Sequence, residues 1–479
     1  MSQADSNPTR CPMTDPEAAD RVSIRQLYLP MIDLWYSKEM AVPLTLSTML
    51  FDPESDGGST GTSVFIKDYH KRDLRQHQPG HRSNQAKRTY YAGVTPDLYR
   101  DRFGEPVRRF WDDLLAPGNE GHGLPVLYDE RYYDMYWVLH VASSGDAVPA
   151  AANVVGRSFN TMLSLIEHTG QDTEEGREVE QARADLLANR PEMQSWLEQR
   201  VREIDGSETP EDRATFAWHW LRNGMHPDDV ELEVFHNFLA FSQWGNTLDQ
   251  TTRLLREGNP DRTVRDCFRR TMGCEDRDAR APHGANPFSK LDRFVMELFR
   301  TIMPNDGSMS NRPTSLQTKG VGDVAAVHEH RPIANDPLLW DDPLAFDPDR
   351  YLDKPVSNQI TGNTLKSMGL DSCPFAREDY VTQDGRDTVI TNSPFGTVYN
   401  KHRGTDHPVL EHPGYSPFGF GYRRCPGELL TIEVFKDFLR KVWDDDIEFE
   451  SIQSDGRTVP LGVRNMVEND ITFRRRSRS

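Results

Sequence analysis

Apolar residues recur every three or four positions in several stretches of this chain, and each such stretch predicts a helix. In residues 291–303 the apolar positions are Leu291, Phe294, Val295, Leu298 and Ile302. After Gly427 they are Leu429, Ile432, Phe435, Leu439 and Val442. Pro304 follows the first stretch and marks its end, because proline cannot continue a helix.

A third helix is predicted from Pro227 to about Thr251. Proline suits the first helical position, and the acidic residues that follow suit the positive end of the helix dipole. Residues 335–352 read differently, as turns punctuated by proline and aspartate. Together these patterns predict a mainly helical protein with a smaller β region, in a single large domain covering residues 1–479.

Composition narrows the possible partners and the compartment. The 479 residues carry a net charge of −19, which argues against binding to nucleic acid or to an anionic membrane. There is no apolar run of about 18 residues and no signal-peptide core at the start of the sequence. The five cysteines are few and unpatterned, which is consistent with a reducing compartment. We therefore expect a cytoplasmic protein.

Cys425 stands in the most informative segment, residues 417–428, just before the predicted helix that follows Gly427. Glycines on both sides let the backbone approach a bulky planar group closely. Arg423 offers a fixed charge for an acidic group, and Phe418 can shield the sulfur from water. Near a helix N-terminus, amides and the dipole favour thiolate over thiol, so Cys425 is a candidate metal ligand.

This segment resembles the haem-ligand loop of cytochrome P450, Phe-x-x-Gly-x-Arg-x-Cys-x-Gly. The residues that match its fixed positions are Phe418, Gly421, Arg423, Cys425 and Gly427. The resemblance implies a haem b cofactor with Cys425 as the axial ligand to the iron and the other four residues around the haem. It is strong over residues 290–440 and weak elsewhere.

Two further segments resemble the family and occur in the family's order. Glu297 and Arg300 match its Glu-x-x-Arg helix, and Arg350 lies in Phe-x-Pro-x-Arg-Tyr, close to the family's Phe-x-Pro-x-Arg-Phe. The resemblance implies a buried triad of these three residues. By the same analogy His81 and Arg88, although their spacing is unusual, and Arg312 are candidates to bind the haem propionates.

The predicted helix from Pro227 departs from the family where the oxygen chemistry takes place. Placing Thr247 at the family's threonine puts Asn246 where the family usually has an acid, and a second alignment, which keeps Gly245, has no threonine. An asparagine donates a hydrogen bond but cannot exchange a proton at neutral pH. We take Thr247 and Asn246 as candidate catalytic residues, with Phe241 and Trp244 as candidate walls of the substrate pocket.

Residues 353–412 form a longer connection than the family usually has, and we interpret them as an inserted loop region with a short hairpin. Electrons are expected from a separate ferredoxin- or flavodoxin-type donor with its reductase, since no dinucleotide fingerprint or iron–sulfur cysteine cluster occurs. A basic cluster is the candidate docking patch for this donor: Arg423, Arg424, Lys436, Arg440 and Lys441.

Three hypotheses for function follow from the resemblance. The first is monooxygenation of a small organic substrate, of the kind found in secondary metabolism. The alternative keeps the haem-thiolate site but inserts no oxygen, as in oxidative phenol coupling or hydroperoxide rearrangement, and the missing acid before Thr247 motivates it. The third is a haem sensor or carrier, which would show no substrate-induced spin shift and no turnover.

Overall fold

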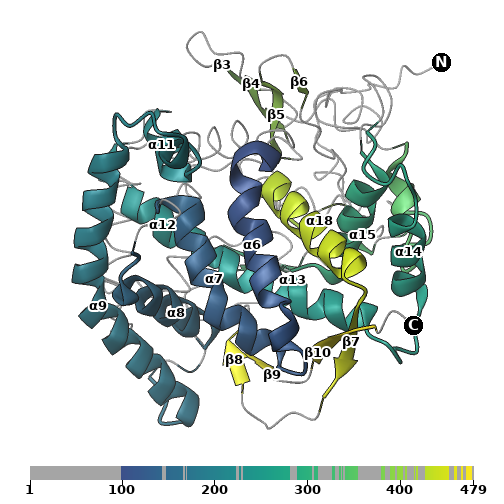
Figure 1. Cartoon of the computed structure of the whole chain (residues 1–479), viewed down its shortest axis with the longest axis horizontal. Helices are drawn as coiled ribbons and strands as arrows, with labels where there is room; N and C mark the ends of the chain where they lie inside the picture. Colours follow the sequence, from purple (N-terminus) through teal and green to yellow (C-terminus); the bar gives the residue numbers. More distant parts are fainter. Residues whose placement is uncertain are drawn as a thin grey trace, which may run out of the picture. The chain divides into compact units, whose positions relative to one another are not determined.

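Helices α15 (Lys290–Ile302) and α18 (Glu428–Asp444) pack against each other and against helices from earlier in the chain (Figure 1). The computed structural model describes residues 99–142, 147–165, 170–222, 230–280, 288–304, 340–353, 427–452 and 471–476, with short strands and isolated positions between residues 168 and 467. Both helices occur where the apolar periodicity predicts them.

The described residues fall into two units. One is built from residues 99–278, 290–304 and 427–476, and the other from described residues of 279–289 and 307–418. The earlier helices of the first unit are η4 (Tyr99–Phe103), α6 (Gly104–Leu114), η5 (Pro117–Asn119), α7 (Leu124–His140), α8 (Ala150–Ser164), α9 (Glu174–Ile204), α10 (Pro210–Arg213), α11 (Phe216–Arg222), α12 (Val230–Asn237), α13 (Leu239–Leu255) and α14 (Thr263–Met272).

Helix α18 is buried on nearly every side, although its sequence carries several charges. Lys436 is 4% exposed and lies between Asp292 of α15 and Glu433, at 2.7 and 2.9 Å. Asp437 accepts a hydrogen bond from the hydroxyl of Tyr99 at 3.0 Å. Buried charges are tolerated when they are paired in this way, so α18 lies in the interior of the unit.

The predicted helix from Pro227 is two helices in the structure. Helix α12 ends at Asn237, and α13 begins at Leu239 after a single turn residue, Phe238. The Phe238 ring packs against the rings of Tyr136 and Trp137, with centroids 5.0 and 5.6 Å apart. Neither proline nor glycine occurs at this break, which explains why the sequence pattern does not indicate it.

Strands β7 (Ile447–Ser451) and β10 (Ile471–Arg475) pair antiparallel in the first unit, with Phe449 opposite Phe473. A second antiparallel pair joins β8 (Thr458–Pro460) to β9 (Asn465–Val467). None of the helices in the described part of the chain has the length and apolar character needed to cross a membrane.

The other unit contains the antiparallel pair β1 (Gly307–Ser310) and β2 (Ala326–Glu329), and the short helix η8 (Pro348–Tyr351). Within residues 353–412 it has four consecutive antiparallel strands: β3 (Asp379–Thr382), β4 (Val389–Ser393), β5 (Gly396–His402) and β6 (Thr405–Asp406). This sheet is more extensive than the single short hairpin expected there; whether the segment is an insertion stays a prediction.

Candidate functional site

Helix α18 begins immediately after the cysteine segment. Its N-cap is Gly427, two residues beyond Cys425, and a glycine has no side chain that could cap this end of the helix. The first amide N–H groups of a helix have no partner within the helix, and together with the dipole they attract negative charge. Cys425 itself lies outside the described residues, as do Gly421 and Arg423, while Phe418 occupies a half-buried turn position.

Glu297 and Arg300 form a buried ion pair on α15. Arg300 donates from Nε and Nη2 to the two carboxylate oxygens of Glu297, at 2.9 and 2.8 Å. The side chains are 0% and 2% exposed, so the pair is fully desolvated. Their spacing of three residues on one helix face is what makes the two-bond geometry possible.

Arg350, the third residue of the predicted triad, belongs to the other unit. It donates to the backbone carbonyls of Asp341, Asp342 and Ala345, at 3.0, 3.2 and 2.7 Å. Its guanidinium also lies over the ring of Trp340, 5.5 Å from the centroid. Arg350 therefore holds its own turn-rich segment together, and its place in a triad stays a prediction.

Thr247 lies in the middle of α13 and is buried. Its hydroxyl donates to the backbone oxygen of Gln243, one helical turn earlier, at 2.8 Å. A threonine hydroxyl carries two lone pairs besides its proton, so this bond uses the donor and leaves acceptor capacity.

Asn246 is half-buried and is fixed at both ends of its amide. Its Nδ2 donates to the backbone oxygen of Pro304 at 3.4 Å, and its Oδ1 accepts from Nε2 of Gln250 at 2.8 Å. Gln243, Asn246 and Gln250 are spaced by three and four residues and form a half-buried polar stripe along α13. Sequence reasoning missed the two glutamines, although this spacing was visible.

Phe241 and Trp244 belong to a packed aromatic cluster. The Phe241 ring stacks on Tyr133 with centroids 5.3 Å apart, and Trp244 meets Tyr132 edge-on at 6.1 Å. Trp244 Nε1 donates to the hydroxyl of Thr431 on α18 at 3.1 Å. The Phe241 ring thus packs between α13 and α7, and Trp244 also reaches α18; the predicted contact of both rings with a substrate stays untested.

The cations predicted to form a docking patch are largely neutralised within the protein. Besides the buried Lys436, Arg440 contacts Asp437 and Asp278 at 2.6 and 2.5 Å, and Lys441 contacts Asp112 and Asp445 at 2.6 and 3.0 Å. The docking interpretation is wrong for Lys436, which is buried, whereas for Arg440 and Lys441, whose charges are paired but partly exposed, it stays a prediction. Arg424 and the candidate propionate ligands His81, Arg88 and Arg312 lie outside the described residues.

No family model and no curated protein matches this chain. Solved structures do. A cyanobacterial CYP120A1 with bound retinoic acid matches at 14% identity and a TM-score of 0.50, covering 93% of this chain and 87% of the other. A mutant of P450 EryK in complex with erythromycin B matches at 12% identity and 0.50, covering 94% and 90%. The chain therefore has the cytochrome P450 fold, which confirms the predicted fold class and, at the level of the fold, the resemblance to this family.

Proposed function

We propose that this protein is a haem-thiolate oxidoreductase that oxidises a small organic molecule, with Cys425 as the axial ligand of haem b. The observation that carries the proposal is the N-terminus of α18, with Gly427 at the N-cap and Cys425 two residues before it, in a chain of cytochrome P450 fold.

The residues present suit this group. Amides and the dipole at the start of α18 lower the free energy of a thiolate relative to a thiol, and a thiolate is the form that binds iron. In this proposal Phe418 covers the sulfur, Gly421 and Gly427 leave room for the porphyrin, and Arg423 pairs with a propionate, as do His81, Arg88 and Arg312. When bound, a haem with an axial thiolate supplies electron density that favours O–O cleavage.

Thr247 and Asn246 have different roles in this proposal. Thr247 orders a water or the substrate through the lone pairs that its bond to Gln243 leaves available. Asn246 has no proton to exchange; its amide is oriented by Gln250 on the same helix, and its hydrogen bond to Pro304 ties α13 to the end of α15. Protons then have to reach the reaction through water, the Thr247 hydroxyl or a hydroxyl of the substrate.

Monooxygenation is the reaction we favour, and the missing acid at Asn246 supports oxidative coupling or hydroperoxide rearrangement as the second candidate. Incubation with labelled O2 and measured NAD(P)H consumption distinguishes them. Monooxygenation consumes equal amounts of O2, NAD(P)H and substrate, with one labelled atom in the product and the other in water. Coupling leaves no label in the product, and rearrangement consumes neither O2 nor NAD(P)H.

The electron donor in this proposal is a separate ferredoxin- or flavodoxin-type protein with its reductase, and the enzyme works in the cytoplasm. Lys436 is buried and takes no part in the docking of this donor, whereas Arg440 and Lys441, which are 28% and 24% exposed, remain candidates together with Arg423 and Arg424. Reconstitution with a ferredoxin system and with a flavodoxin system, followed by reduction of the iron under CO, identifies the class that delivers electrons.

A further inference from the structure

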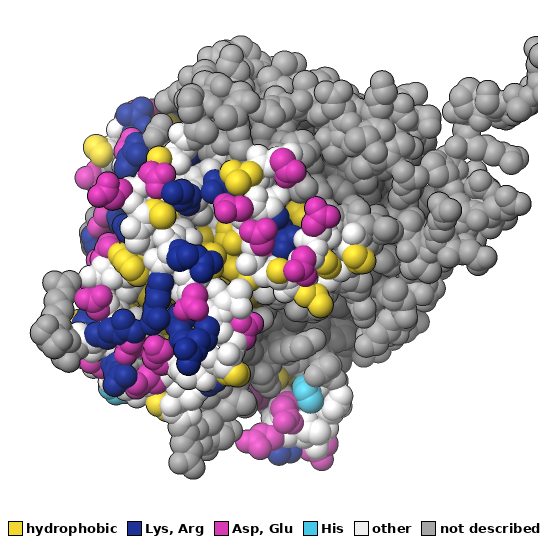
Figure 2. All heavy atoms as spheres, turned by 90° about the vertical axis from the view of Figure 1, so that its right-hand side faces the viewer, with side chains coloured by type: hydrophobic (Ala, Val, Ile, Leu, Met, Phe, Trp, Pro, Cys, Tyr) yellow, Lys and Arg dark blue, Asp and Glu magenta, His cyan; other side chains and the backbone are white. Residues whose placement is uncertain are grey.

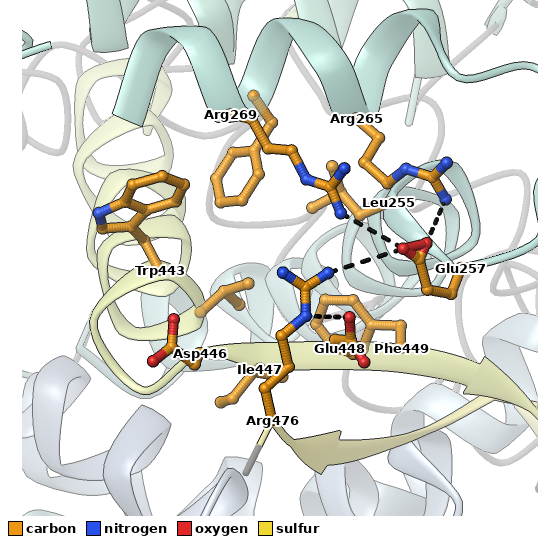
Figure 3. A pocket seen from close by; sticks show the side chains of 12 residues that line it. Leu255, Glu257, Arg265, Arg269, Trp443, Asp446, Ile447, Glu448, Phe449 and Arg476 are labelled. Atoms are coloured by element: carbon orange, nitrogen blue, oxygen red, sulfur yellow. Dashed lines mark hydrogen bonds and ion pairs between the residues drawn. The ribbon is translucent and has the colours of Figure 1, made fainter. Parts of the chain in front are cut away.

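A pocket with a volume of about 70 Å³ lies where the end of α13, helix α14, the end of α18 and strand β7 meet (Figure 3). All of these elements belong to one unit and to the described part of the chain. From Glu428 to Trp443 helix α18 rises by about 22 Å, at 1.5 Å per residue. The pocket is thus far along α18 from the end that Cys425 precedes.

Three arginines converge on one carboxylate at this pocket. Glu257 lies 2.8 Å from Nη1 of Arg265, 3.3 Å from Nη2 of Arg269 and 3.7 Å from Nη2 of Arg476. Figure 3 shows the three guanidinium groups directed toward Glu257 from α14 above and from the chain after β10 below. Glu257 is itself anchored, because its backbone N–H donates to the carbonyl of Phe449 at 3.0 Å.

The guanidinium donors at this pocket outnumber their acceptors. Each guanidinium has five N–H groups, whereas Glu257 offers two oxygens and Glu448 is shared between Arg476 and Arg474. The guanidinium of Arg269 is 42% exposed and contacts Glu257 alone among the described residues. Asp446 lines the pocket on the side of Trp443, away from Glu257 (Figure 3).

Arg265 provides a second and independent observation. It is 7% exposed, and its Nη1 contacts Glu257 and donates to the carbonyl of Arg256, while its Nε is buried with no hydrogen-bond partner among the described residues. A buried N–H group without an acceptor costs free energy, and a bound ion is one of the ordinary explanations for such a group. Arg269 and Arg270 are both exposed on α14, and Arg269 lines the pocket whereas Arg270 does not. Figure 2 faces this side of the molecule and shows Lys and Arg side chains close together, with Asp and Glu among them.

We propose that this pocket binds a small oxyanion, either a carboxylate or a phosphate group, between Arg269 and Arg476. Both kinds of anion accept two parallel N–H bonds from a guanidinium. The volume of about 70 Å³ fits a group of this size and is less than half of the roughly 150 Å³ that accommodates a benzene ring. Glu257 is then a positioning residue that keeps the three guanidinium groups together. The proposal does not depend on haem binding.

Calorimetric titration of the full-length protein tests this directly, with inorganic phosphate in one series and acetate in the other, at constant ionic strength set by chloride. We expect saturable binding of at least one anion, and a rise in melting temperature that follows the same saturation curve. The series that saturates identifies the source: phosphate alone indicates a phosphorylated ligand, and acetate indicates an organic acid. Heat that never saturates in either series would overturn the proposal.

Arg269→Gln and Arg476→Gln remove the proposed contacts from half-exposed positions, so folding is not at risk. Each is expected to weaken binding about tenfold or more, a loss of about 1.4 kcal/mol. Arg270→Gln is the matched control, because it neutralises an exposed arginine on the same helix outside the pocket. Equal weakening by Arg270→Gln and Arg269→Gln would mean that the anions respond only to the general charge of this surface.

Discussion

Arg300 donates two hydrogen bonds to Glu297, at 2.9 and 2.8 Å, inside a helix that is buried on almost every side. Replacing Arg300 with Leu leaves the Glu297 carboxylate buried without this partner. We expect the free energy of unfolding to fall by about 3–5 kcal/mol, the usual cost of breaking one half of a buried ion pair. Urea denaturation of both proteins measures it.

The exposed pair Arg109–Glu105 on α6 is the matched control, because its side chains are 56% and 55% exposed. Arg109→Ala is expected to cost about 0–1 kcal/mol, as surface pairs do. If Arg300→Leu costs no more than Arg109→Ala, the buried pair does not stabilise the fold as described here.

Replacing threonine with valine should have opposite effects on stability at two buried threonines of α13. Thr247→Val removes a hydroxyl that donates to Gln243, whereas the hydroxyl of Thr251 is buried with no partner among the described residues. We expect Thr247→Val to destabilise by about 1 kcal/mol and Thr251→Val to stabilise by a similar amount. Thr247→Val should in addition lower the amount of product formed per NAD(P)H, and Thr251→Val should leave that ratio unchanged. A lower ratio in both variants would contradict the role given to Thr247.

Substitutions of Trp244 test whether its ring belongs to the packed core or lines the substrate pocket. Its ring is 5% exposed and bonds to Thr431, so Trp244→Ala should destabilise by about 3–5 kcal/mol through the cavity it leaves. Trp244→Phe keeps most of the volume and loses the hydrogen bond, at a cost of about 1 kcal/mol. Thermal denaturation checks both values. A variant that changes the substrate range with unchanged stability would instead place the ring at the substrate pocket, as the sequence suggested.

The buried imidazole of His140 should make the stability of the protein depend on pH. Burial lowers the pKa of its imidazole from 6.5 to about 3, against the opposing effect of its hydrogen bond to the Tyr136 carbonyl. The unfolded chain therefore binds a proton at this residue between these pH values and the folded protein does not. Because of His140, the free energy of unfolding should fall by about 1.4 kcal/mol per pH unit as the pH drops from 6.5 to about 3.

His140→Phe keeps an aromatic ring against Tyr136, whose ring centroid lies 4.0 Å from that of His140. The variant should lose stability less steeply than the wild type when both are titrated from pH 7 to pH 4 in urea. If the stability of both proteins falls equally with pH, the pKa of His140 is the same in the folded and the unfolded state, and burial does not lower it.

The sequence predicts where helices α15 and α18 lie, but not which of their side chains are buried or which partners those side chains have. The periodicity of residues 291–303 and of the residues after Gly427 predicts α15 and α18 correctly. It treats Lys436 as a surface charge, because its buried partner Asp292 is distant in sequence and only folding brings the two together. In residues 379–406 the sequence predicts one short hairpin where the structure has four strands, although Val389-Ile390 and Val398-Tyr399 carry β-branched and aromatic residues on either side of Pro394.

In the candidate site, too, the sequence predicts contacts within one helix but not contacts between helices. Glu297 and Arg300 are three residues apart, so their pairing follows from helix geometry alone. The bond from Asn246 to the carbonyl of Pro304, and the bond from Trp244 to Thr431, join helices that are distant in sequence. No local pattern encodes these contacts, and they make Asn246 an anchor of α13 and Trp244 a part of the core.

The most direct test of the haem-thiolate proposal is the difference spectrum of the reduced, CO-bound protein, recorded for wild type, Cys425→Ser and Cys373→Ser. Cys373 is the control because it is the cysteine nearest to Cys425 in the sequence and no Gly-x-Arg precedes it. The account predicts the long-wavelength Soret band of a thiolate-ligated haem in wild type and in Cys373→Ser, and its loss in Cys425→Ser with the helical circular dichroism retained. A short-wavelength band in all three proteins, or loss of the long-wavelength band in Cys373→Ser alone, would contradict it, because the iron would then be held by another residue.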